Sequence, residues 1–320
     1  MRLVTLRAEE RLQRALQSLE GLAIGDALGE MLAARAGKAF ELAEADLLPS
    51  GPWFHTDDTE MAIAIVQTLA AAGQIHNDTL AMRFVQRYQL DPDRGYGSGT
   101  RRQLQQMADG ESWQITSSSA FGGQGSKGNG GAMRVAPVGA FFFDDMERVI
   151  RAAETSCIVT HSHPEAIAGS IAVAVAAAAA FRLRENLNSL AASRLMEQVL
   201  QHTPESEVRE GLVLASQLPG ATPIREAALA LGNGSLVTAP DTVPLAIWCA
   251  SHHLHDYRRA VLTVISANGD CDTLAAIVGG IVALSAGREG IPKHWRSAKE
   301  KLPFAIEPEA NPVAGMGSAA

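Results

Sequence analysis

The chain is short of cysteine, and its first residues do not have the pattern of a secretion signal. Its three cysteines, Cys157, Cys249 and Cys271, lie far apart and include no CxxC pair. An odd number of widely spaced cysteines supports neither a disulfide framework nor a thiolate zinc site. The N-terminus alternates charged and apolar residues and lacks the apolar core of a signal peptide. We therefore expect reduced thiols and a cytoplasmic protein.

Basic runs and long apolar runs are missing too. The net charge is −8 and no stretch is rich in lysine and arginine, so we expect no binding to nucleic acid or to an anionic membrane. A small phosphorylated ligand stays compatible with this charge. The longest apolar run, residues 166–181, is too short and too rich in alanine for a membrane span and predicts a buried helix. The oligomeric state does not follow from these features.

Sustained alternation of apolar and polar residues, which is typical of strands, is also missing. Apolar residues instead recur at helical spacing, and 47% of the chain is hydrophobic. We predict an all-α fold in one domain, residues 1–306, and expect a disordered tail, 307–320. Residues 32–55 and 111–132 are expected to be irregular. The predicted helices span residues up to 31, 56–72, 77–90, 99–109, 132–143, 145–158, 164–183, 189–201, 206–217, 223–231, 241–253, 256–267 and 273–287.

Glycines at 21, 25 and 29 recur at every fourth residue of the first predicted helix. They form a smooth stripe, although each glycine costs about 1 kcal/mol of helix stability relative to alanine. Another helix or a ligand can approach the backbone there, and tight helix packing is the simpler explanation. Asp26 beside the stripe is either an interior hydrogen-bonding carboxylate or part of a site.

Two helix starts far apart in the chain carry hydroxyls and adjacent carboxylates. The first is Thr56-Asp57-Asp58, and the second is the segment 268–273. An ordinary capped, acidic first turn explains either one alone, since the N-cap prefers threonine and the helix dipole favours carboxylates. Neighbouring carboxylates repel each other, however, and the pattern occurs twice. The pair of motifs therefore suggests one shared site for a hard cation.

Two glycine-containing loops are candidate anion sites. The loop 91–99 ends at a predicted helix start. The segment 117–131 has free backbone N–H groups and should end at the start of the predicted helix 132–143, where such groups bind anions. The second segment contains a GxGxxG pattern, Gly123 to Gly128. No apolar strand precedes it and no acidic residue closes a following strand, so we reject a dinucleotide fold. A merely mobile loop remains the alternative to a phosphate site.

These motifs together resemble the ADP-ribosylglycohydrolase family, which includes dinitrogenase-reductase-activating glycohydrolase and the ADP-ribosyl-arginine and ADP-ribosyl-serine hydrolases. The resemblance rests on residues 21–29, 56–61, 125–137, 160–161 and 269–276, in the family's order. It implies an orthogonal helix bundle with a cleft for two Mg²⁺ ions, or Mn²⁺. The implied metal ligands are Thr56, Asp57, Asp58, Asp270, Asp272 and Thr273. Hard oxygen donors of this kind suit Mg²⁺, and Cys271 should point away.

The resemblance implies ADP-ribose on an acceptor as the substrate. Lys127 stands where many relatives carry an aromatic residue that contacts the adenine. The sequence therefore leaves the adenine contact undecided, and a contact between Lys127 and a phosphate is the alternative. The implied ligand-binding residues are Gly97, Ser98, Gly99, Gly125, Ser126, Lys127, Gly128, Asn129, Gly130, Met133 and His161.

The catalytic group is the part of the resemblance that this sequence leaves open. Many relatives carry a glutamate at the position of Ala33, and this chain instead has Glu30. The candidate catalytic residues are Glu30, Asp57 and Asp272, with a water held by the metals as another candidate for handling the proton. Either the protein hydrolyses the bond between ADP-ribose and its acceptor, or it binds ADP-ribose with little or no turnover.

Overall fold

The computed structural model describes residues 8–304, and every regular element within them is a helix. Within this part of the chain, extended segments meet in two isolated bridges, Trp53 with Lys299 and Gly128 with Thr238. The prediction of an all-α fold is therefore confirmed. The described residues contain no parallel sheet, which removes the dinucleotide-fold interpretation of the GxGxxG pattern. The predicted tail, 307–320, lies outside the described residues.

The helices follow one another along the whole described chain, most of them through short connections, although residues 45–56 form a longer segment between α2 and α3. In order they are α1 (Ala8–Leu32), η1 (Ala33–Lys38), α2 (Ala39–Glu44), α3 (Asp57–Ala72), α4 (Asn77–Leu90), α5 (Ser98–Ala108), α6 (Trp113–Ser118), α7 (Ala120–Gly123), η2 (Asn129–Gly131), α8 (Ala136–Phe141), α9 (Met146–Ile158), α10 (Pro164–Leu183), α11 (Ala191–His202), α12 (Glu207–Gln217), α13 (Ile224–Leu231), α14 (Ala239–His252), α15 (Tyr257–Ile265), α16 (Cys271–Ala286), η3 (Arg288–Gly290) and α17 (Lys293–Ala298).

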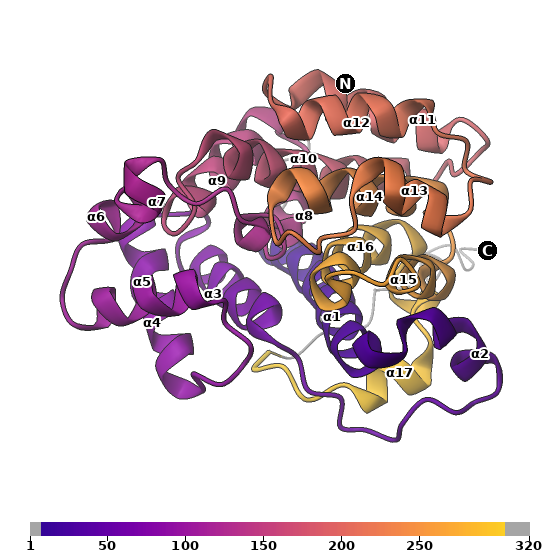
Figure 1. Ribbon diagram of the computed structural model, residues 1–320, viewed down its shortest axis with the longest axis horizontal. Helices are drawn as coiled ribbons and strands as arrows, with labels where there is room; N and C mark the ends of the chain where they lie inside the picture. Colours follow the sequence, from indigo (N-terminus) through magenta and orange to yellow (C-terminus); the bar gives the residue numbers. More distant parts are fainter. Residues whose placement is uncertain (1–7, 305–320) are drawn as a thin grey trace, which may run out of the picture.

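Helices α1 and α16 pack side by side at the centre of the molecule (Figure 1). Their backbones nearly touch, because a Cβ atom added to Gly21, Gly25 or Gly29 would lie 2.4, 2.0 or 2.3 Å from a carbonyl oxygen of α16. Real Cβ atoms do not come so close to backbone atoms. The glycine stripe therefore serves helix packing, as its simpler explanation predicted, and it fixes where α16 begins relative to α1.

Helix α10 forms a second part of the core and packs against α8, α9, α11, α14 and α16. By length and composition it could cross a membrane, but 83% of its most apolar window is buried inside the protein. Its run of alanines lets the neighbouring helices approach closely, and nearly all of residues 166–181 are buried. The prediction of a buried core helix fits this packing.

Three local predictions were wrong. The segment 111–132, expected to be irregular, contains α6, α7 and η2, and the side chain of Ser112 caps the start of α6. Residues 32–55 contain η1 and α2 because several good helix formers surround Gly37, and the proline-containing segment 49–52 comes only later. The helix expected over 132–143 covers only Ala136–Phe141, with Pro137 in its first turn, a position that proline favours. Between η2 and α8 the chain makes a turn. The glycine-rich loop therefore does not run directly into a helix.

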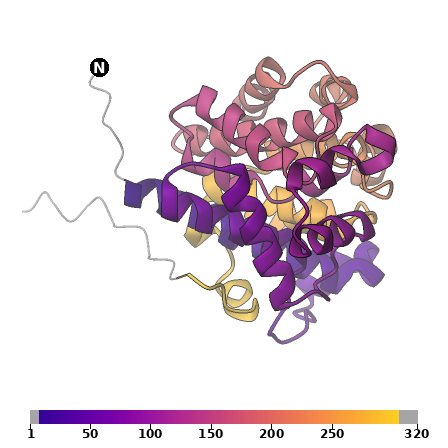
Figure 2. The ribbon, with the colours of Figure 1, turned by 90° about the vertical axis from the view of Figure 1, so that its left-hand side faces the viewer.

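Helices α3 to α7 stand together on one side of the bundle (Figure 1). Figure 2 turns that side toward the viewer and shows these helices in front of the bundle. A cleft lies between α5, α6 and α7 of this group and the start of α16, and the start of α3 forms part of its floor. The helix packing thus builds the two walls of the cleft from separate parts of the chain.

Candidate active site

The start of α3 carries the first acidic pair. Thr56 is the N-cap residue, with an extended backbone, and its hydroxyl accepts a hydrogen bond from the backbone N–H of Asp58 at 3.4 Å. Asp57 and Asp58 are only 8% and 2% exposed, yet both line the cleft. Because Asp57 and Asp58 lie in the first turn of α3, both carboxylates can face the cleft, as the sequence pattern predicts.

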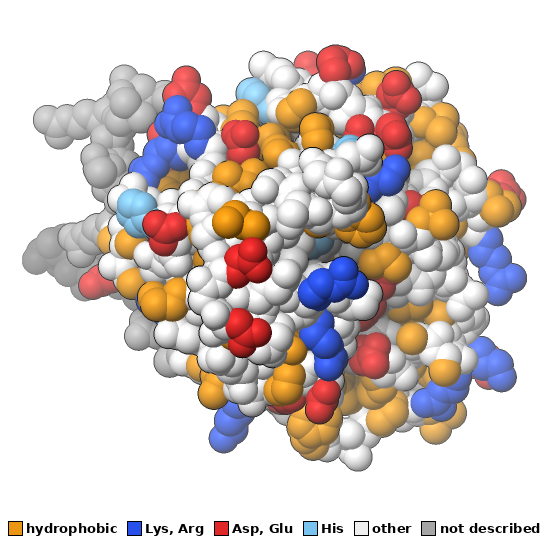
Figure 3. All heavy atoms as spheres, turned by 60° about the vertical axis from the view of Figure 1, so that its left-hand side comes forward, with side chains coloured by type: hydrophobic (Ala, Val, Ile, Leu, Met, Phe, Trp, Pro, Cys, Tyr) orange, Lys and Arg blue, Asp and Glu red, His pale blue; other side chains and the backbone are white. Residues whose placement is uncertain are grey.

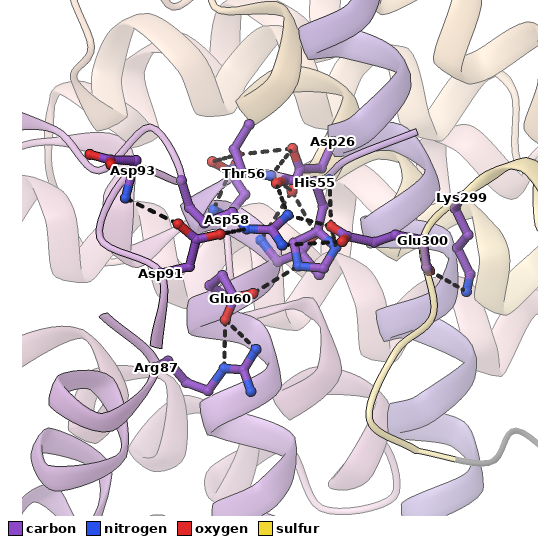
Figure 4. Close-up of polar contacts among 12 residues, drawn as sticks. Asp26, His55, Thr56, Asp58, Glu60, Arg87, Asp91, Asp93, Lys299 and Glu300 are labelled. Atoms are coloured by element: carbon purple, nitrogen blue, oxygen red, sulfur yellow. Dashed lines mark hydrogen bonds and ion pairs between the residues drawn. The ribbon is translucent and has the colours of Figure 1, made fainter. Parts of the chain in front are cut away.

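Asp26 holds this helix start from behind (Figure 4). It is fully buried on α1 and accepts hydrogen bonds from the backbone N–H groups of Thr56, at 3.0 and 3.1 Å, and of Thr59, at 3.1 Å. It also accepts from the hydroxyls of Thr56, at 2.9 Å, and Thr59, at 2.5 Å. Asp26 is therefore the interior hydrogen-bonding carboxylate of the two alternatives, and it positions the acidic pair.

The start of α16 forms the second acidic group. Asp270 is the N-cap residue, while Asp272 and Thr273 lie in the first turn, and all three line the cleft. The Cys271 thiol is buried and donates to the carbonyl of Ile265 at 3.6 Å, so it points away from the cleft. Hydroxyl and carboxylate oxygens from this turn therefore face those of α3 without sulfur between them.

Helix α1 brings the two starts together. Gly29 packs against the carbonyl of Cys271 at the beginning of α16, and Asp26, three residues earlier, binds the N–H groups at the beginning of α3. One rigid helix thus sets the spacing of both acidic groups. This arrangement links the glycine stripe to the site, although the two features look unrelated along the sequence.

Within residues 8–304, no Lys or Arg forms an ion pair with the four carboxylates of the cleft floor, Asp57, Asp58, Asp270 and Asp272. Burial, followed by the charges of Asp26 and Asp272, raises the pKa of Asp57 to about 8 and that of Asp58 well above its ordinary value. Burial and the Asp272 charge also raise the pKa of Asp270 to about 8. Among the described residues, Asp58 Oδ1 is buried without a hydrogen-bond partner. A bound cation would lower the pKa of these carboxylates and would give Asp58 Oδ1 a partner.

The donor set fits hard divalent cations. It offers carboxylate and hydroxyl oxygens with no sulfur or imidazole, which is the set that Mg²⁺ and Mn²⁺ prefer. Within residues 8–304, no group of three or more His, Cys, Asp or Glu side chains is placed to hold an ion by itself. Ions in this cleft would therefore also draw on the hydroxyls of Thr56 and Thr273 and on water, in keeping with the several waters that Mg²⁺ retains.

In the metal-free protein, we expect the unfolding temperature to fall as the pH rises from about 4 to about 8. The folded pKa values of Asp57 and Asp270, about 8, lie above the ordinary 3.8. Between these two pKa values the folded state holds protons that the unfolded chain has released. The stabilisation by these protons is therefore complete below pH 3.8 and is lost as the pH rises through about 8. Added Mg²⁺ should flatten the slope.

Thermal unfolding in a chelator, repeated with Mg²⁺, measures this effect. The double variant Asp57→Asn, Asp270→Asn serves as the control because it removes two of the groups with raised pKa values at almost constant volume. It should show a much shallower slope than the wild type. Equal slopes in the two proteins would contradict the expectation.

The glycine-rich loop closes the cleft opposite α5. Asn129 is buried, and its amide donates to Asp270 Oδ2 at 2.7 Å and to Thr242 Oγ1 at 3.0 Å. The backbone N–H of Ala239 donates to the carbonyl of Lys127 at 3.0 Å. The loop is thus tied both to the acidic floor and to α14, so this part of it is held in place rather than merely mobile.

His161 presents one edge of its ring to this loop. Cβ atoms added to Gly128 and Gly130 would lie 3.1 Å from its Nε2 and 2.6 Å from its Cε1. Buried Arg134 donates to Thr160 Oγ1 at 2.9 Å, and this hydroxyl contacts His161 Nδ1 at 2.7 Å. Burial and the Arg134 charge lower the pKa of His161 to about 3. With Nδ1 accepting from the hydroxyl, the neutral ring offers an Nε2–H donor at the cleft.

The turn at Gly97-Ser98-Gly99 forms the other wall. Gly97 is the N-cap residue of α5, and all three residues line the cleft. No atom lies within 4 Å of a Cβ added to Gly97 or Gly99. Packing within the protein therefore does not require glycine here. The open space leaves the backbone N–H groups of this helix start accessible to a ligand.

The cleft has a volume of about 1090 Å³. Sixteen of the eighteen predicted site residues line it, whereas Thr56 lies just behind Asp57 and Glu30 lies outside the lining. Glu30 is exposed on α1, where burial and the Asp272 charge raise its pKa. The lining residues are Asp57, Asp58, Gly97, Ser98, Gly99, Gly125, Ser126, Lys127, Gly128, Asn129, Gly130, Met133, His161, Asp270, Asp272 and Thr273.

Sequence reasoning missed several lining residues. Phe121 lines the cleft with 71% of its surface exposed and a φ of 52°, and Leu236 and Val237 are exposed at the opposite rim. The Oε1 atom of Gln103 is buried in the α5 wall and has no partner among the described residues. An isolated aromatic residue within the glycine- and serine-rich segment 117–131 was a visible signal for Phe121. The other three residues gave none.

Comparison with known proteins identifies the family of the chain and several relatives. The family model described as ADP-ribosylglycohydrolase matches residues 7–311. The chain is 28% identical to the mouse ADP-ribosylhydrolase ARH3 over 92% of this chain and 89% of the mouse protein. It is 30% identical to the Xenopus tropicalis ARH3 over 88% of this chain and 90% of that protein. It is also 26% identical to the ADP-ribosylarginine hydrolase Tri1 of Serratia proteamaculans, over 89% and 75%.

A solved structure described as an ADP-ribosylglycohydrolase-related protein complex has the same fold. It superimposes with a TM-score of 0.64 at 23% identity and covers 91% of this chain and 94% of that chain. At this identity the likeness shows the fold alone. The family model, in contrast, matches nearly the entire sequence. The chain therefore belongs to the ADP-ribosylglycohydrolase family.

Proposed function

We propose that the protein is a hydrolase, dependent on Mg²⁺ or Mn²⁺, that releases ADP-ribose from a modified side chain or small molecule. The observation that carries this proposal is the acidic floor, where two helix starts place buried and half-buried carboxylates around one cleft, with no ion pair to a Lys or Arg among the described residues. Membership of the family supplies the substrate class. The names of the ARH3 and Tri1 relatives support hydrolysis of an ADP-ribosyl bond.

The cleft suits both halves of an ADP-ribosyl group. Lys127 and Arg102 bring positive charge to its walls, and His161 adds a neutral N–H donor, so a diphosphate finds donors on both sides. The side of the molecule that carries α4 to α7 comes forward in Figure 3, where Lys and Arg side chains stand near the middle of the face. The exposed ring of Phe121 offers a base a stacking surface.

Bound divalent cations would supply positive charge that orients the distal ribose hydroxyls and stabilises the transition state. Thr56, Asp57 and Asp58 would hold them from one side, and Asp270, Asp272 and Thr273 from the other. During hydrolysis the bond from C1″ to the acceptor breaks and a water oxygen bonds to C1″. Asp57 and Asp272 stand on the cleft floor, where a carboxylate can take the proton from the water. The acceptor leaves with the proton that the carboxylate took from the water.

One observation favours a second candidate, an ADP-ribose-binding protein with little turnover. Glu30 does not line the cleft, and Ala33 has no carboxylate to offer. If catalysis needs a carboxylate from this part of α1, binding would survive and hydrolysis would be slow. The two candidates share the same ligand and the same metals, so only turnover separates them.

Release of ADP-ribose from serine-, arginine- and nucleobase-linked substrates, with Mg²⁺ or with a chelator, tests the proposal. We expect release on at least one linkage and a large loss in the chelator. Equal rates with and without metal would contradict the metal dependence. Tight ADP-ribose binding by calorimetry without release on any linkage would instead establish the second candidate.

A further inference from the structure

The segment that follows α17 runs beside the chain that leads into α3. The backbone N–H of Trp53 donates to the carbonyl of Ala298 at 2.6 Å, and the N–H of Glu300 donates to the carbonyl of Trp53 at 2.9 Å. The two segments are separated by more than 240 residues in sequence. They therefore form a small tertiary contact directly before the acidic helix start.

Glu300 is the centre of this contact (Figure 4). Its carboxylate accepts from the backbone N–H of His55 at 3.0 Å and lies 2.6 Å from His55 Nδ1. Both oxygens also pair with the guanidinium of Arg94, at 3.1 Å for Nη2 and with Nη1 closer still. Arg94 Nη1 in turn donates to the carbonyl of His55 at 2.9 Å. One side chain thus ties the approach to α3 to the loop before α5.

The far side of His55 is held as well. Its Nε2 lies 3.0 Å from Glu60 Oε1, and the second oxygen of Glu60 accepts from Arg87 Nε at 2.5 Å. His55 and Glu60 are 6% and 2% exposed. The imidazole is therefore clamped between two carboxylates in a mostly buried network, where side-chain positions are strongly determined.

Both segments held by Glu300 come next to the start of α3 one residue later. Thr56 directly follows His55 in the chain, and Gly95 directly follows Arg94. A Cβ added to Gly95 would lie 3.6 Å from Thr56 Cβ and 3.7 Å from Asp57 Oδ1. A shift of either segment would thus be felt at the start of α3. None of the motifs that mark the cleft in the sequence includes Glu300.

We propose that Glu300 is a positioning residue of the metal site, holding the segment 53–56 and the loop 91–97 against each other so that Thr56, Asp57 and Asp58 keep the geometry that binds the cations. This inference rests on the proposed function, because it needs the acidic floor to bind metal. Partners that orient metal ligands from outside typically change metal affinity or activity by about 10- to 100-fold when removed.

The test compares Glu300→Gln with Glu289→Gln by Mg²⁺ titration. Glutamine keeps the size of the side chain but loses its charge. Glu289 is a matched control because it lies in the same C-terminal part and makes a 3.5 Å ion pair with Arg296 while remaining largely exposed. The readouts are the rise in unfolding temperature with Mg²⁺ concentration, and the Mg²⁺ concentration that gives half-maximal release of ADP-ribose.

We expect Glu300→Gln to need about tenfold more Mg²⁺ in both readouts, with the rate at saturating Mg²⁺ largely recovered. Glu289→Gln should titrate like the wild type. A Glu300→Gln protein that is less stable but has wild-type Mg²⁺ dependence would overturn the proposal, because that is the result of a purely structural role. A wild type whose unfolding temperature does not respond to Mg²⁺ would overturn both this inference and the metal-dependent function.

A second variant covers the case in which Glu300→Gln does not fold. Arg94→Lys keeps a cation beside Glu300 but loses the fork that reaches both the carboxylate and the carbonyl of His55. It should move the Mg²⁺ dependence in the same direction by a smaller factor. Wild-type Mg²⁺ dependence in Arg94→Lys would then count against the proposal.

Discussion

Replacing Asp58 by asparagine is expected to lower ADP-ribose release by about 10²- to 10³-fold or more and to abolish the stabilisation by Mg²⁺. Asp58 is 2% exposed, and its Oδ1 has no partner among the described residues. Its pKa is raised by burial and by the charges of Asp26, Asp272 and Asp57. Without metal this carboxylate destabilises the fold, whereas with metal it becomes a ligand.

The same substitution should therefore raise the unfolding temperature of the metal-free protein at about pH 8, because it removes a buried, repelled carboxylate at almost constant volume. Opposite effects on stability and on activity distinguish a ligand from a structural residue. Asp93→Asn, a change of an exposed carboxylate on the loop beside the cleft, is the control and should leave both properties nearly unchanged. A loss of stability in metal-free Asp58→Asn would contradict this interpretation.

Replacing Gly25 by alanine is expected to destabilise the protein by about 3 kcal/mol, at the upper end of the usual range for overpacking. The new Cβ would lie 2.0 Å from the carbonyl oxygen of Ala275, a backbone atom that cannot turn away. Alanine recovers only about 1 kcal/mol of helix propensity. Because α1 sets the spacing of the two acidic helix starts, Mg²⁺ binding should weaken in the same variant.

Gly37→Ala is the matched control for this change. Gly37 is exposed, and an added Cβ meets only the end of the Arg225 side chain at 3.3 Å. Its effect should stay within about 0.5 kcal/mol, as is usual for surface substitutions. Urea unfolding of the two variants measures the difference. Similar unfolding free energies for both would show that the glycine stripe is not needed for the packing of α1 on α16.

The fold was predictable because helical periodicity depends on local sequence. The bounds predicted for α4 and α10 match the structure, since each has a clear start and a sharp end. The helix predicted over 132–143 failed at both ends because glycine, proline and three consecutive phenylalanines give weak local signals. The weak predictions thus fall where tertiary contacts, such as the Gly128 to Thr238 bridge, determine the backbone.

The site was predictable only where its residues form recognisable motifs. The acidic starts of α3 and α16 and the glycine-rich loop were found this way, and the structure brings them to one cleft, while their binding of metal stays a prediction. The role of Asp26 could not be chosen in advance, because its partners Thr56 and Thr59 lie on another helix. Glu300 and Gln103 carry no local pattern, so only the folded structure relates them to the cleft.

Crystals soaked with Mn²⁺ and ADP-ribose would test the shared metal site most directly, because anomalous diffraction locates manganese without reference to activity. The expected result is two peaks in the cleft, both between the oxygen atoms of Asp57 and Asp58 on one side and those of Asp270 and Asp272 on the other. Absence of manganese there at saturating concentration, or binding only elsewhere on the protein, would contradict the interpretation of the two acidic helix starts as one metal centre.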